Sequence, residues 1–471
     1  MTDRGFVPPP DPYSPRRRTA LVLTGTGTAG AYHAGVLRAL HEAGVKIDVV
    51  AGRGVGAIGA LFAAVDGAQR LWDERGFWRG PGARHMYVWQ PALRFAVLCL
   101  AAAVLVIAVP LAAVAAGLVV FPLDFVLKLF GASGVADWYV GVVQAALSPG
   151  MLPTWLPRVA VLILVAGVGT LIVTGWRDRD RRRRRGRAWW RAVPPPLSAG
   201  PGIEHCWAVM WDLVRGAARV KAPSRVELAR RYAELLVENI GQPGFRELFI
   251  TVHDLDARRD LVFALVSDTR RRDLVRRPTS QSADARRGEV FDLTGLGRDH
   301  LSDALAASLA LPLGAEPHAV TFPAEGFWRG ETHRLCDRPG SVLRLIEELA
   351  MVDVEQIILV SAAADSPGPH ALAPPRLDGR GRIGEYLQSF EVAVVRDAAQ
   401  LCSESGPRLY IVRPAHNPVG PLDFDGGFDD RSDRRPGLSE LMSRGYEDAY
   451  HQFIEPVVAA SGEQVGVRER P

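Results

Sequence analysis

The chain has 471 residues, enough for about three domains of average size. Its composition, 48% hydrophobic and 23% charged, excludes a chain that is disordered or of low complexity throughout. A net charge of +4 does not favour nucleic-acid binding, and four widely spaced cysteines argue against a zinc site or a disulfide-stapled secreted domain. We expect no cofactor.

The N-terminal region predicts a glycine loop between a strand and a helix. Residues 1–17 are polar and proline-rich, and we expect a disordered leader rather than a signal peptide. A short apolar strand at 19–23 leads into Gly25-Thr26-Gly27-Thr28-Ala29-Gly30, and amphipathic helical spacing follows at 32–43. Such glycines let backbone N–H groups approach an anion at a helix N-terminus. The spacing also fits a dinucleotide site, but such a site needs an acidic residue at the end of the second strand. Asp48 instead lies at the beginning of that strand.

The second strand ends in Gly52-Arg53-Gly54-Val55-Gly56-Ala57, and a helix of small residues follows. A sharp strand-to-helix turn of this G-x-?-x-G form is typical of a nucleophile elbow, whose central residue presents its side chain above the sheet. Gly54 holds the central position. We take Gly25, Gly27, Gly30 and Val55 as the candidate backbone groups of an oxyanion or binding site.

Two apolar runs predict a transmembrane hairpin at 91–176. Residues 95–123 carry no charge over 29 positions, and residues 159–176 carry none over 18. A helix needs about 20 apolar residues to cross a bilayer, so the first run is long enough and the second is borderline without 151–157. A pair of buried helices in a soluble core is the alternative.

Arginines orient the predicted hairpin. Residues 177–191 carry nine Arg against two Asp, whereas the connection 124–158 has only Lys128 and Arg158 as cations. The positive-inside rule then places both flanks in the cytoplasm, and 124–158 either outside or in the interface. We expect membrane lipids as partners, with anionic head groups at Arg181, Arg182, Arg183, Arg184 and Arg185; a plain stop-transfer anchor is the alternative.

The remaining chain predicts an α/β domain with a mostly parallel sheet. A basic, Pro/Gly-rich linker at 177–202 follows the hairpin, and residues 203–460 complete the domain that 18–90 begins, with a tail at 461–471. Helical spacing at 203–240 precedes apolar strand-like runs at 248–252, 261–266, 357–360 and 409–412. Strands that alternate with helices favour a parallel sheet.

The N-terminal block resembles the patatin-like phospholipase family, whose pattern is a G-G-G-x-R-G loop, a G-V-L-x-x-L-x-x-x-G helix and G-x-S-x-G. Gly35-Val36-Leu37, Leu40, Gly44 and Gly56-Ala57-Ile58 fall in step. Residues 246–254 resemble the family's R-x-L-x-I…D strand, and 307–312 its A-S-x-x-x-P segment. The resemblance covers 18–66 and about 240–365, and it implies a three-layer α/β sandwich, interrupted here by the two-helix hairpin.

The chain departs from the family at the positions that carry chemistry. Family members are acyl hydrolases with a Ser–Asp dyad, in which an aspartate of a D-G-G/A turn activates the elbow serine. Gly54 stands at the serine position and supplies no nucleophile. In the glycine loop, Thr26 replaces the middle glycine and Ala29 replaces the arginine.

Two aspartates are candidates for the dyad acid that the resemblance implies. Asp337 has the expected place in chain order, although Arg338 and Pro339 replace the glycines after it. Asp425 precedes Gly426-Gly427 but lies far downstream. We assign Asp337 as the residual acid and keep Asp425 as the alternative.

These features together predict a membrane-anchored patatin-like protein without the usual dyad activity, acting as a lipid-binding or regulatory pseudo-hydrolase. The alternative is an active lipid acyl hydrolase with an unorthodox nucleophile, drawn from the hydroxyls of Thr24, Thr26, Thr28 and Tyr32 with His33 as a base.

Overall fold

The computed structural model describes residues 12–131, 134–147, 156–177, 195–276, 288–295, 297–365, 378–429 and 432–459. These residues divide into two compact units. Unit 1 comes from residues 1–88 and 198–471, and unit 2 comes from residues 89–197.

A nine-stranded sheet forms the centre of unit 1. Its path is β11-β10-β1-β2-β5-β6-β7, and β9 pairs with both β5 and β8 off this path. The strands are β1 (Thr19–Thr24), β2 (Val49–Arg53), β5 (Glu247–Asp254), β6 (Arg259–Leu265), β7 (Val290–Asp292), β8 (His318–Thr321), β9 (Thr332–Cys336), β10 (Gln356–Ser361) and β11 (Arg408–Val412).

The sheet is mainly parallel, as predicted. β1 lies between β10 and β2 and pairs in parallel with both, and β11 and β5 extend the parallel part on either side. β5 and β6 pair as an antiparallel hairpin. Asp48 lies just before β2, where its carboxylate accepts the Thr19 N–H at 2.9 Å, so it is not at the carboxyl end of the strand.

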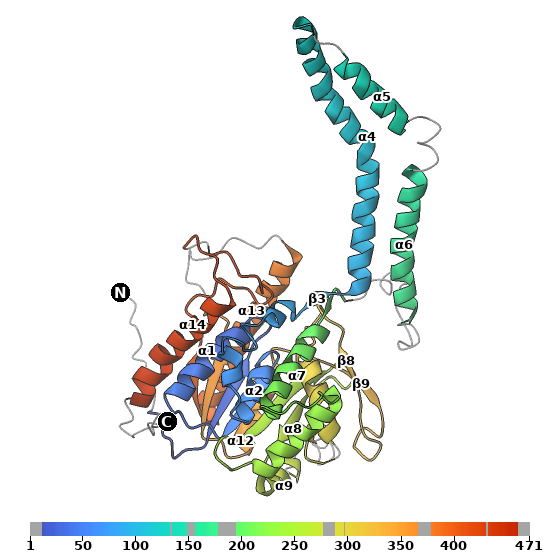
Figure 1. The fold of residues 1–471 in the computed structure, drawn as a ribbon. Helices are drawn as coiled ribbons and strands as arrows, with labels where there is room; N and C mark the ends of the chain where they lie inside the picture. Colours follow the sequence, from blue (N-terminus) through green and yellow to red (C-terminus); the bar gives the residue numbers. More distant parts are fainter. Residues whose placement is uncertain are drawn as a thin grey trace. The chain divides into compact units, whose positions relative to one another are not determined.

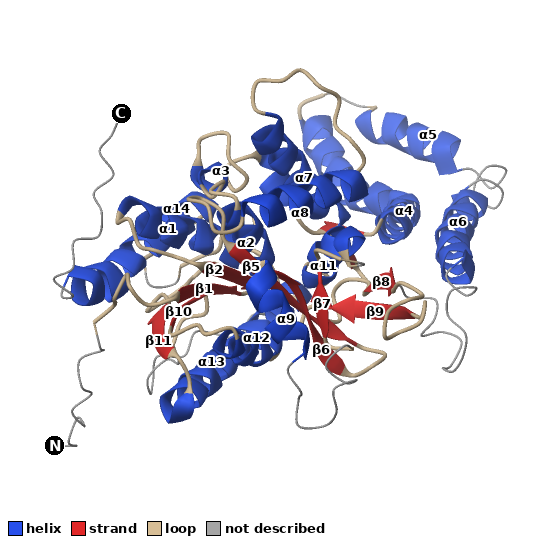
Figure 2. Ribbon diagram, turned by 90° about the horizontal axis from the view of Figure 1, so that it is seen from below, coloured by secondary structure: helices blue, strands red, loops and turns tan. Residues whose placement is uncertain are grey.

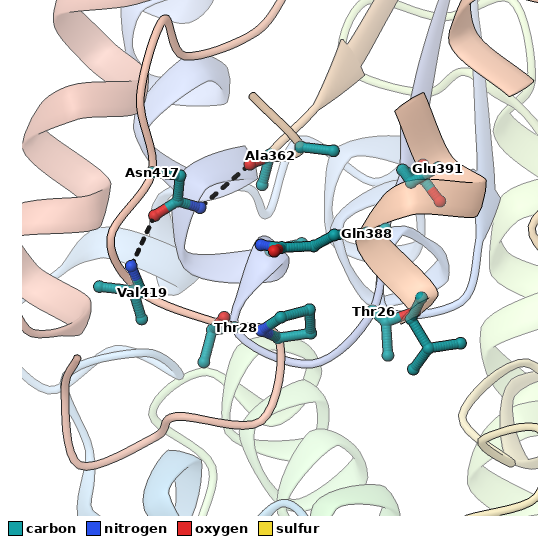
Figure 3. Close-up of a pocket in the computed structure, with 12 residues that line it drawn as sticks. Thr26, Thr28, Ala362, Gln388, Glu391, Asn417 and Val419 are labelled. Atoms are coloured by element: carbon teal, nitrogen blue, oxygen red, sulfur yellow. Dashed lines mark hydrogen bonds between the residues drawn. The ribbon is translucent and has the colours of Figure 1, made fainter. Parts of the chain in front are cut away.

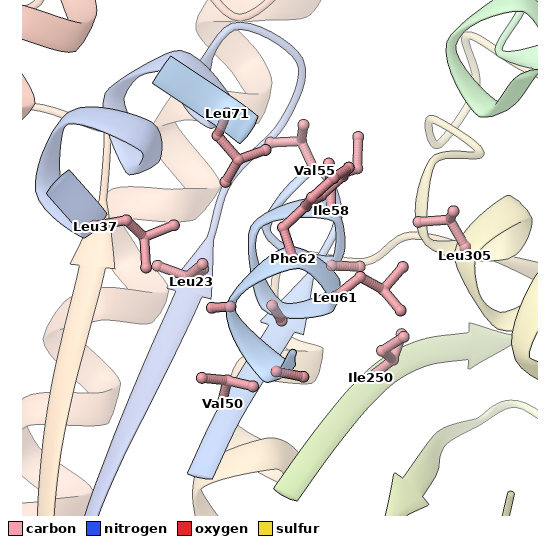
Figure 4. Close-up of a cluster of buried hydrophobic side chains, with 14 of the residues drawn as sticks. Leu23, Leu37, Val50, Val55, Ile58, Leu61, Phe62, Leu71, Ile250 and Leu305 are labelled. Atoms are coloured by element: carbon pink, nitrogen blue, oxygen red, sulfur yellow. The ribbon is translucent and has the colours of Figure 1, made fainter. Parts of the chain in front are cut away.

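Helices cover both faces of the sheet (Figure 2). Alternate residues of β1 enter different cores: Leu21 and Leu23 belong to one buried cluster, Ala20 and Val22 to the other. Figure 4 shows the first cluster around Leu23, Ile58 and Phe62. On that face lie α1 (Ala29–Glu42), α2 (Gly56–Ala64), α3 (Gln69–Trp72), α7 (Gly200–Arg215), α8 (Arg225–Asn239), α11 (Leu301–Ser308), α14 (Leu438–Ala449) and the π-helical η4 (Tyr450–Val458). On the other face lie α9 (Asp268–Arg276), α12 (Ser341–Met351) and α13 (Gly379–Ser405).

The described residues also form short elements. These include the 3-10 helices η1 (Pro81–His85) and η3 (Arg298–His300), and the paired strands β3 (Val88–Trp89) and β4 (Leu197–Ser198).

Unit 2 contains α4 (Pro91–Leu129), α5 (Val135–Leu147) and α6 (Leu156–Arg177). Both predicted apolar runs are helical, but α4 has 39 residues and extends past the predicted end at 123, and α5 was not predicted. Among the described helices, α4 is the one long and apolar enough to cross a membrane; in α6 the apolar stretch at 158–173 is shorter. The two-helix crossing therefore stays a prediction.

Candidate functional site

Gly54 lies at the bend between β2 and α2. Its φ of 57° lies in the left-handed region that favours glycine. Gly56, two residues on, packs so closely that a Cβ there would lie 2.0 Å from the Leu23 carbonyl oxygen. A sharp turn with small residues on both sides of Gly54 is the geometry that the sequence predicted.

The space above Gly54 is filled. A Cβ on Gly54 would lie 2.3 Å from the Gly25 carbonyl oxygen and 3.0 Å from Asp337 Oδ2. Asp337 follows β9, and its backbone N–H donates to the Ala310 carbonyl at 3.0 Å. The structure therefore brings together the elbow and the aspartate that the sequence assigned to it.

Asp337 is bound by Arg53, the residue before Gly54. Arg53 Nη1 donates to Asp337 Oδ1 at 2.9 Å and to Oδ2 at 2.8 Å. The Arg53 side chain is fully buried and Asp337 is 2% exposed. A buried carboxylate held by one guanidinium in this way accepts charge-assisted hydrogen bonds and has no contact with solvent.

Two further side chains complete this buried cluster. Arg53 Nη2 donates to Glu391 Oε2, and Arg53 Nε donates to Thr24 Oγ1 at 3.0 Å. The Thr24 hydroxyl in turn donates to Glu391 Oε1 at 2.5 Å. Strands β1 and β2, the segment after β9 and helix α13 therefore meet at a single arginine.

Burial sets the titration of this cluster. It raises the pKa of Asp337 to about 6, against the lowering effect of Arg53. Burial also opposes the charge on Arg53, but the neighbouring carboxylates of Asp337 and Glu391 raise the pKa of the guanidinium above its usual value. With one cation between two carboxylates, the cluster has no excess positive charge for a substrate oxyanion.

Val55, a predicted binding residue, hydrogen-bonds to the glycine loop. Its backbone N–H donates to the Gly25 carbonyl at 3.0 Å. The Val55 side chain packs in the hydrophobic core beside Ile58 (Figure 4).

The three loop glycines have different surroundings. Gly25 lines a pocket. Gly27, with φ 57°, lies against Pro421, whose carbonyl oxygen would be 1.9 Å from an added Cβ. The Gly30 N–H donates to the Gly27 carbonyl at 3.3 Å, and an added Cβ on Gly30 would lie 2.0 Å from the Trp78 ring.

The hydroxyls considered as substitute nucleophiles mostly have intramolecular partners. Thr28 donates to the Gly420 carbonyl at 2.8 Å, and Tyr32 donates to Asp448 at 2.9 Å. His33 Nε2 donates to the Thr24 carbonyl at 3.0 Å, and burial lowers the pKa of its imidazole to about 4. His33 is therefore a neutral, fully buried side chain at neutral pH.

A pocket opens beside the glycine loop (Figure 3). It has about 310 Å³ of space, part of it open to solvent. In Figure 3 Gln388 of α13 points across it toward the loop, and Asn417 lies on its rim, where it bonds the backbone of Ala362 and Val419. The lining residues are Gly25, Thr26, Thr28, Ala29, Ala362, Ala363, Leu387, Gln388, Glu391, Asn417, Val419 and Pro421.

The alternative acid has a different environment. Asp425 is exposed, in a turn completed by Gly426 with φ 96°.

The arginines predicted to contact anionic head groups lie outside the described residues; they are Arg181, Arg182, Arg183, Arg184 and Arg185. Sequence reasoning missed Arg53 and Glu391; a cation inside the elbow motif was a visible signal for the first, whereas nothing in the local sequence marked the second.

Known proteins resemble the part of the chain that builds this site. Residues 21–103, which include the glycine loop and the elbow, match the family model described as patatin-like phospholipase. The similarity to the patatin-like phospholipase family thus covers the segment that carries the glycine loop and the elbow. The human patatin-like phospholipase domain-containing protein 6 is 54% identical over 52 residues, which cover 11% of this chain and 4% of that protein.

Two further relatives match the patatin-like chain over similarly short segments. The rat patatin-like phospholipase domain-containing protein 7 is 41% identical over 73 residues, 13% of this chain and 5% of its own. Lysophospholipase nte1 of Aspergillus fumigatus is 48% identical over 48 residues, 10% of this chain and 3% of its own. The matches thus span a small part of these relatives' length.

Among solved structures, VipD from Legionella pneumophila aligns with 94% of the patatin-like chain and 67% of its own chain, at 12% identity and a TM-score of 0.31.

Proposed function

We propose that this patatin-like chain is a membrane-anchored, lipid-binding protein without the family's Ser–Asp hydrolase activity. The observation that carries the proposal is the pairing of Arg53 with Asp337 beneath an elbow that has glycine at its centre. A dyad needs a hydroxyl and a carboxylate that can take up its proton. Gly54 has no hydroxyl, and Arg53 holds both oxygens of Asp337.

The glycine loop supports the same proposal. The Gly25 carbonyl lies 2.3 Å from where a side chain of residue 54 would begin, and it accepts the Val55 N–H. A substrate carbonyl would have to displace it. In a comparable hydrolase, loss of the nucleophile leaves only about 10³–10⁴-fold catalysis over water, which comes from binding and the oxyanion hole.

The pocket beside the loop supports lipid binding. It combines the apolar side chains of Leu387 and Val419 with the polar groups of Gln388 and Asn417, a mixture that suits an amphiphile. The family relationship favours a lipid over other amphiphiles.

For the membrane anchor, we propose that the first half of α4 and α6 cross the bilayer as a hairpin with both ends in the cytoplasm. α6 has 22 residues, about 33 Å at helical rise, close to the hydrocarbon thickness. The arginines at 177–191 follow it in sequence, which fits the positive-inside rule. Arg181 to Arg185 are proposed to contact anionic head groups.

An active hydrolase with a different nucleophile is the second candidate. Thr26 lines the pocket and is the hydroxyl that a substrate there would meet. Ser341 donates to Asp260 at 2.7 Å, which resembles a Ser–Asp pair, but Ser341 is fully buried and His253 donates to the same Asp260 oxygen at 2.8 Å. Thr26 is therefore the residue that an activity test should target.

The decisive experiment uses the full-length protein in phosphatidylcholine nanodiscs. We expect no fluorophosphonate labelling and no release of fatty acid from the wild type, and the same result for Asp337→Asn. Labelling of the wild type that Thr26→Ala abolishes would replace our proposal with the second candidate.

Lipid binding is tested separately with a photo-reactive phosphatidylcholine. Ala363→Trp fills the pocket and is expected to reduce cross-linking strongly. The matched control is Ala393→Trp, on the exposed part of α13, which is expected to leave cross-linking unchanged. Equal cross-linking in both variants would contradict lipid binding at this pocket.

A further inference from the structure

The length of α4 exceeds what one crossing needs. At 39 residues it extends about 58 Å, whereas a whole bilayer with its head groups is about 40–45 Å thick. Pro110 lies near the middle of α4 in the sequence, and a proline inside a helix lacks the N–H for one backbone hydrogen bond and favours a bend. The second half of α4 therefore needs a placement of its own.

α6 packs along the first half of α4. The two helices run side by side in opposite directions (Figure 1), and Gly167 faces Cys99, with 3.0 Å between an added Cβ and the Cys99 Cβ. Since both helices rise equally per residue, Leu156 at the start of α6 lies opposite about residue 110 of α4. From there to Leu129, α4 continues beyond its partner.

α5 packs against this second half instead. The Tyr139 hydroxyl donates to the Ala113 carbonyl, and its ring lies edge-on to Phe121 with 5.9 Å between centroids. Asp124 accepts the Ala136 N–H at 3.1 Å and pairs with Lys128 at 2.8 Å. The second half of α4, residues 111–129, and α5 thus form a second helical hairpin, which we call the distal hairpin.

The distal hairpin leaves large apolar side chains uncovered. Leu118 is 75% exposed, Phe125 67% and Trp138 68%. Asp124, Lys128 and Asp137 are its charged residues, and two of them pair with each other. This surface is too apolar for water. Its charged residues also disfavour the bilayer centre, where a charge is costly to bury. A helix that combines a few charges with exposed aromatic side chains suits the interface between the lipid chains and water.

We propose that the distal hairpin lies in the head-group region of the leaflet remote from Pro91 and Arg177, with the lipid surface as its partner. Trp138 and Phe125 enter the acyl boundary, about 5–10 Å deep, while Asp124 and Lys128 stay at head-group level. The inference rests on the proposed crossing by the first half of α4 and α6. It also explains why α4 is continuous: the span passes into its own interfacial anchor.

The test measures depth in full-length protein reconstituted in phosphatidylcholine liposomes. The four native cysteines become alanine, and single cysteines at Phe125, Trp138, Leu105 and Val220 carry an environment-sensitive fluorophore. Lipids with a nitroxide near the head group or near the acyl end quench it according to depth. We expect Phe125→Cys and Trp138→Cys to be quenched several-fold more by the shallow nitroxide, and Leu105→Cys more by the deep one.

Val220→Cys, in an exposed part of unit 1, is the aqueous control and is expected to be quenched by neither. If Leu105→Cys is not quenched, the proposed membrane crossing itself fails. If Leu105→Cys is deep while Phe125→Cys and Trp138→Cys report water or the bilayer centre, the crossing stands and the interfacial hairpin is overturned.

Discussion

Arg53 Nη1 donates to both carboxylate oxygens of Asp337, at 2.9 and 2.8 Å, from a position next to Gly54 in the chain. Gly54 thus offers no hydroxyl at the elbow, and its neighbour in the chain binds the carboxylate that lies closest to it. Without the arginine at position 53, Asp337 would be a buried carboxylate with no cation beside it, which would lower the stability of the folded chain. Arg53 compensates that charge, so the site is a stable arrangement.

Restoring the serine is expected to destabilise the protein without restoring labelling. In Gly54→Ser the side chain begins 2.3 Å from the Gly25 carbonyl, at a left-handed φ that alone costs about 1 kcal/mol or more. Chemical denaturation in detergent gives the stability, and a fluorophosphonate probe reads the nucleophile.

Two matched variants separate the causes. Gly54→Ala has the same crowding without a hydroxyl, and Gly241→Ala also has a positive φ, 92°, but nothing within 4 Å of the added Cβ. We expect Gly54→Ser and Gly54→Ala to lose similar stability, and clearly more than Gly241→Ala. Strong labelling of Gly54→Ser would show that Asp337 remains able to act as a base.

Removing the arginine is expected to cost much more than removing an exposed one. Arg53→Met leaves Asp337 and Glu391 buried without a cation, for a loss of about 3–5 kcal/mol in the free energy of unfolding. Arg38→Met breaks the exposed pair with Glu42 and should cost about 0.5 kcal/mol or less.

A triple variant tests whether charge is the cause. Arg53→Met with Asp337→Leu and Glu391→Leu removes all three charges and should recover part of the stability, because an apolar cluster of similar volume can replace a buried ion pair. If Arg53→Met alone costs no more than Arg38→Met, the cluster does not hold the site together.

Much of the fold followed from local sequence. The alternation of apolar strands with helices and the glycine-rich turns predicted a mainly parallel sheet, and β1, β2, β10 and β11 lie where apolar runs were found. These signals are short-range: a buried strand and a strained turn each leave a mark within a few residues.

The site was harder to predict because its contacts are long-range. Glu391 is more than 300 residues from both Arg53 and Thr24, and no local pattern distinguishes it from other glutamates on α13. The hydrogen bond from the Val55 N–H to Gly25 was hard to predict for a related reason: it depends on how closely the glycine loop approaches the elbow. The end of α4 was misplaced because a charge at Asp124 does not end a helix when Lys128 and Ala136 satisfy it.

We expect an alanine substitution at the end of the glycine loop to destabilise the protein. Gly30 lies in α1, where alanine would normally stabilise the helix by up to about 1 kcal/mol. Here an added Cβ would be 2.0 Å from the Trp78 ring, so Gly30→Ala is expected to destabilise instead. Thermal unfolding of Gly30→Ala beside Gly30→Ala/Trp78→Leu measures this, since the smaller side chain should recover part of the loss. Equal destabilisation in both variants would contradict the contact.

His33 should make the protein sensitive to acid. Burial lowers the pKa of its imidazole to about 4 in the folded chain, against 6.5 for the free side chain. Between these values the unfolded chain binds more protons, so stability is lost as the pH falls from 6.5 to 4, by up to about 3 kcal/mol. Asp337, whose pKa is raised, stabilises the folded chain as the pH falls over part of this range. The contribution of His33 is therefore measured as the difference in stability between the wild type and a variant that lacks the imidazole.

His33→Gln supplies that difference, because the amide can still donate to the Thr24 carbonyl but does not titrate. We expect the wild type to lose stability relative to His33→Gln as the pH is lowered from 6.5 to 4, by urea denaturation at each pH. If the variant does not fold, the NMR titration of the wild-type imidazole replaces it. An imidazole that gains its proton near pH 6.5 would contradict the buried, neutral state, because a cation at that position would lie beside Arg53 without a counter-charge of its own.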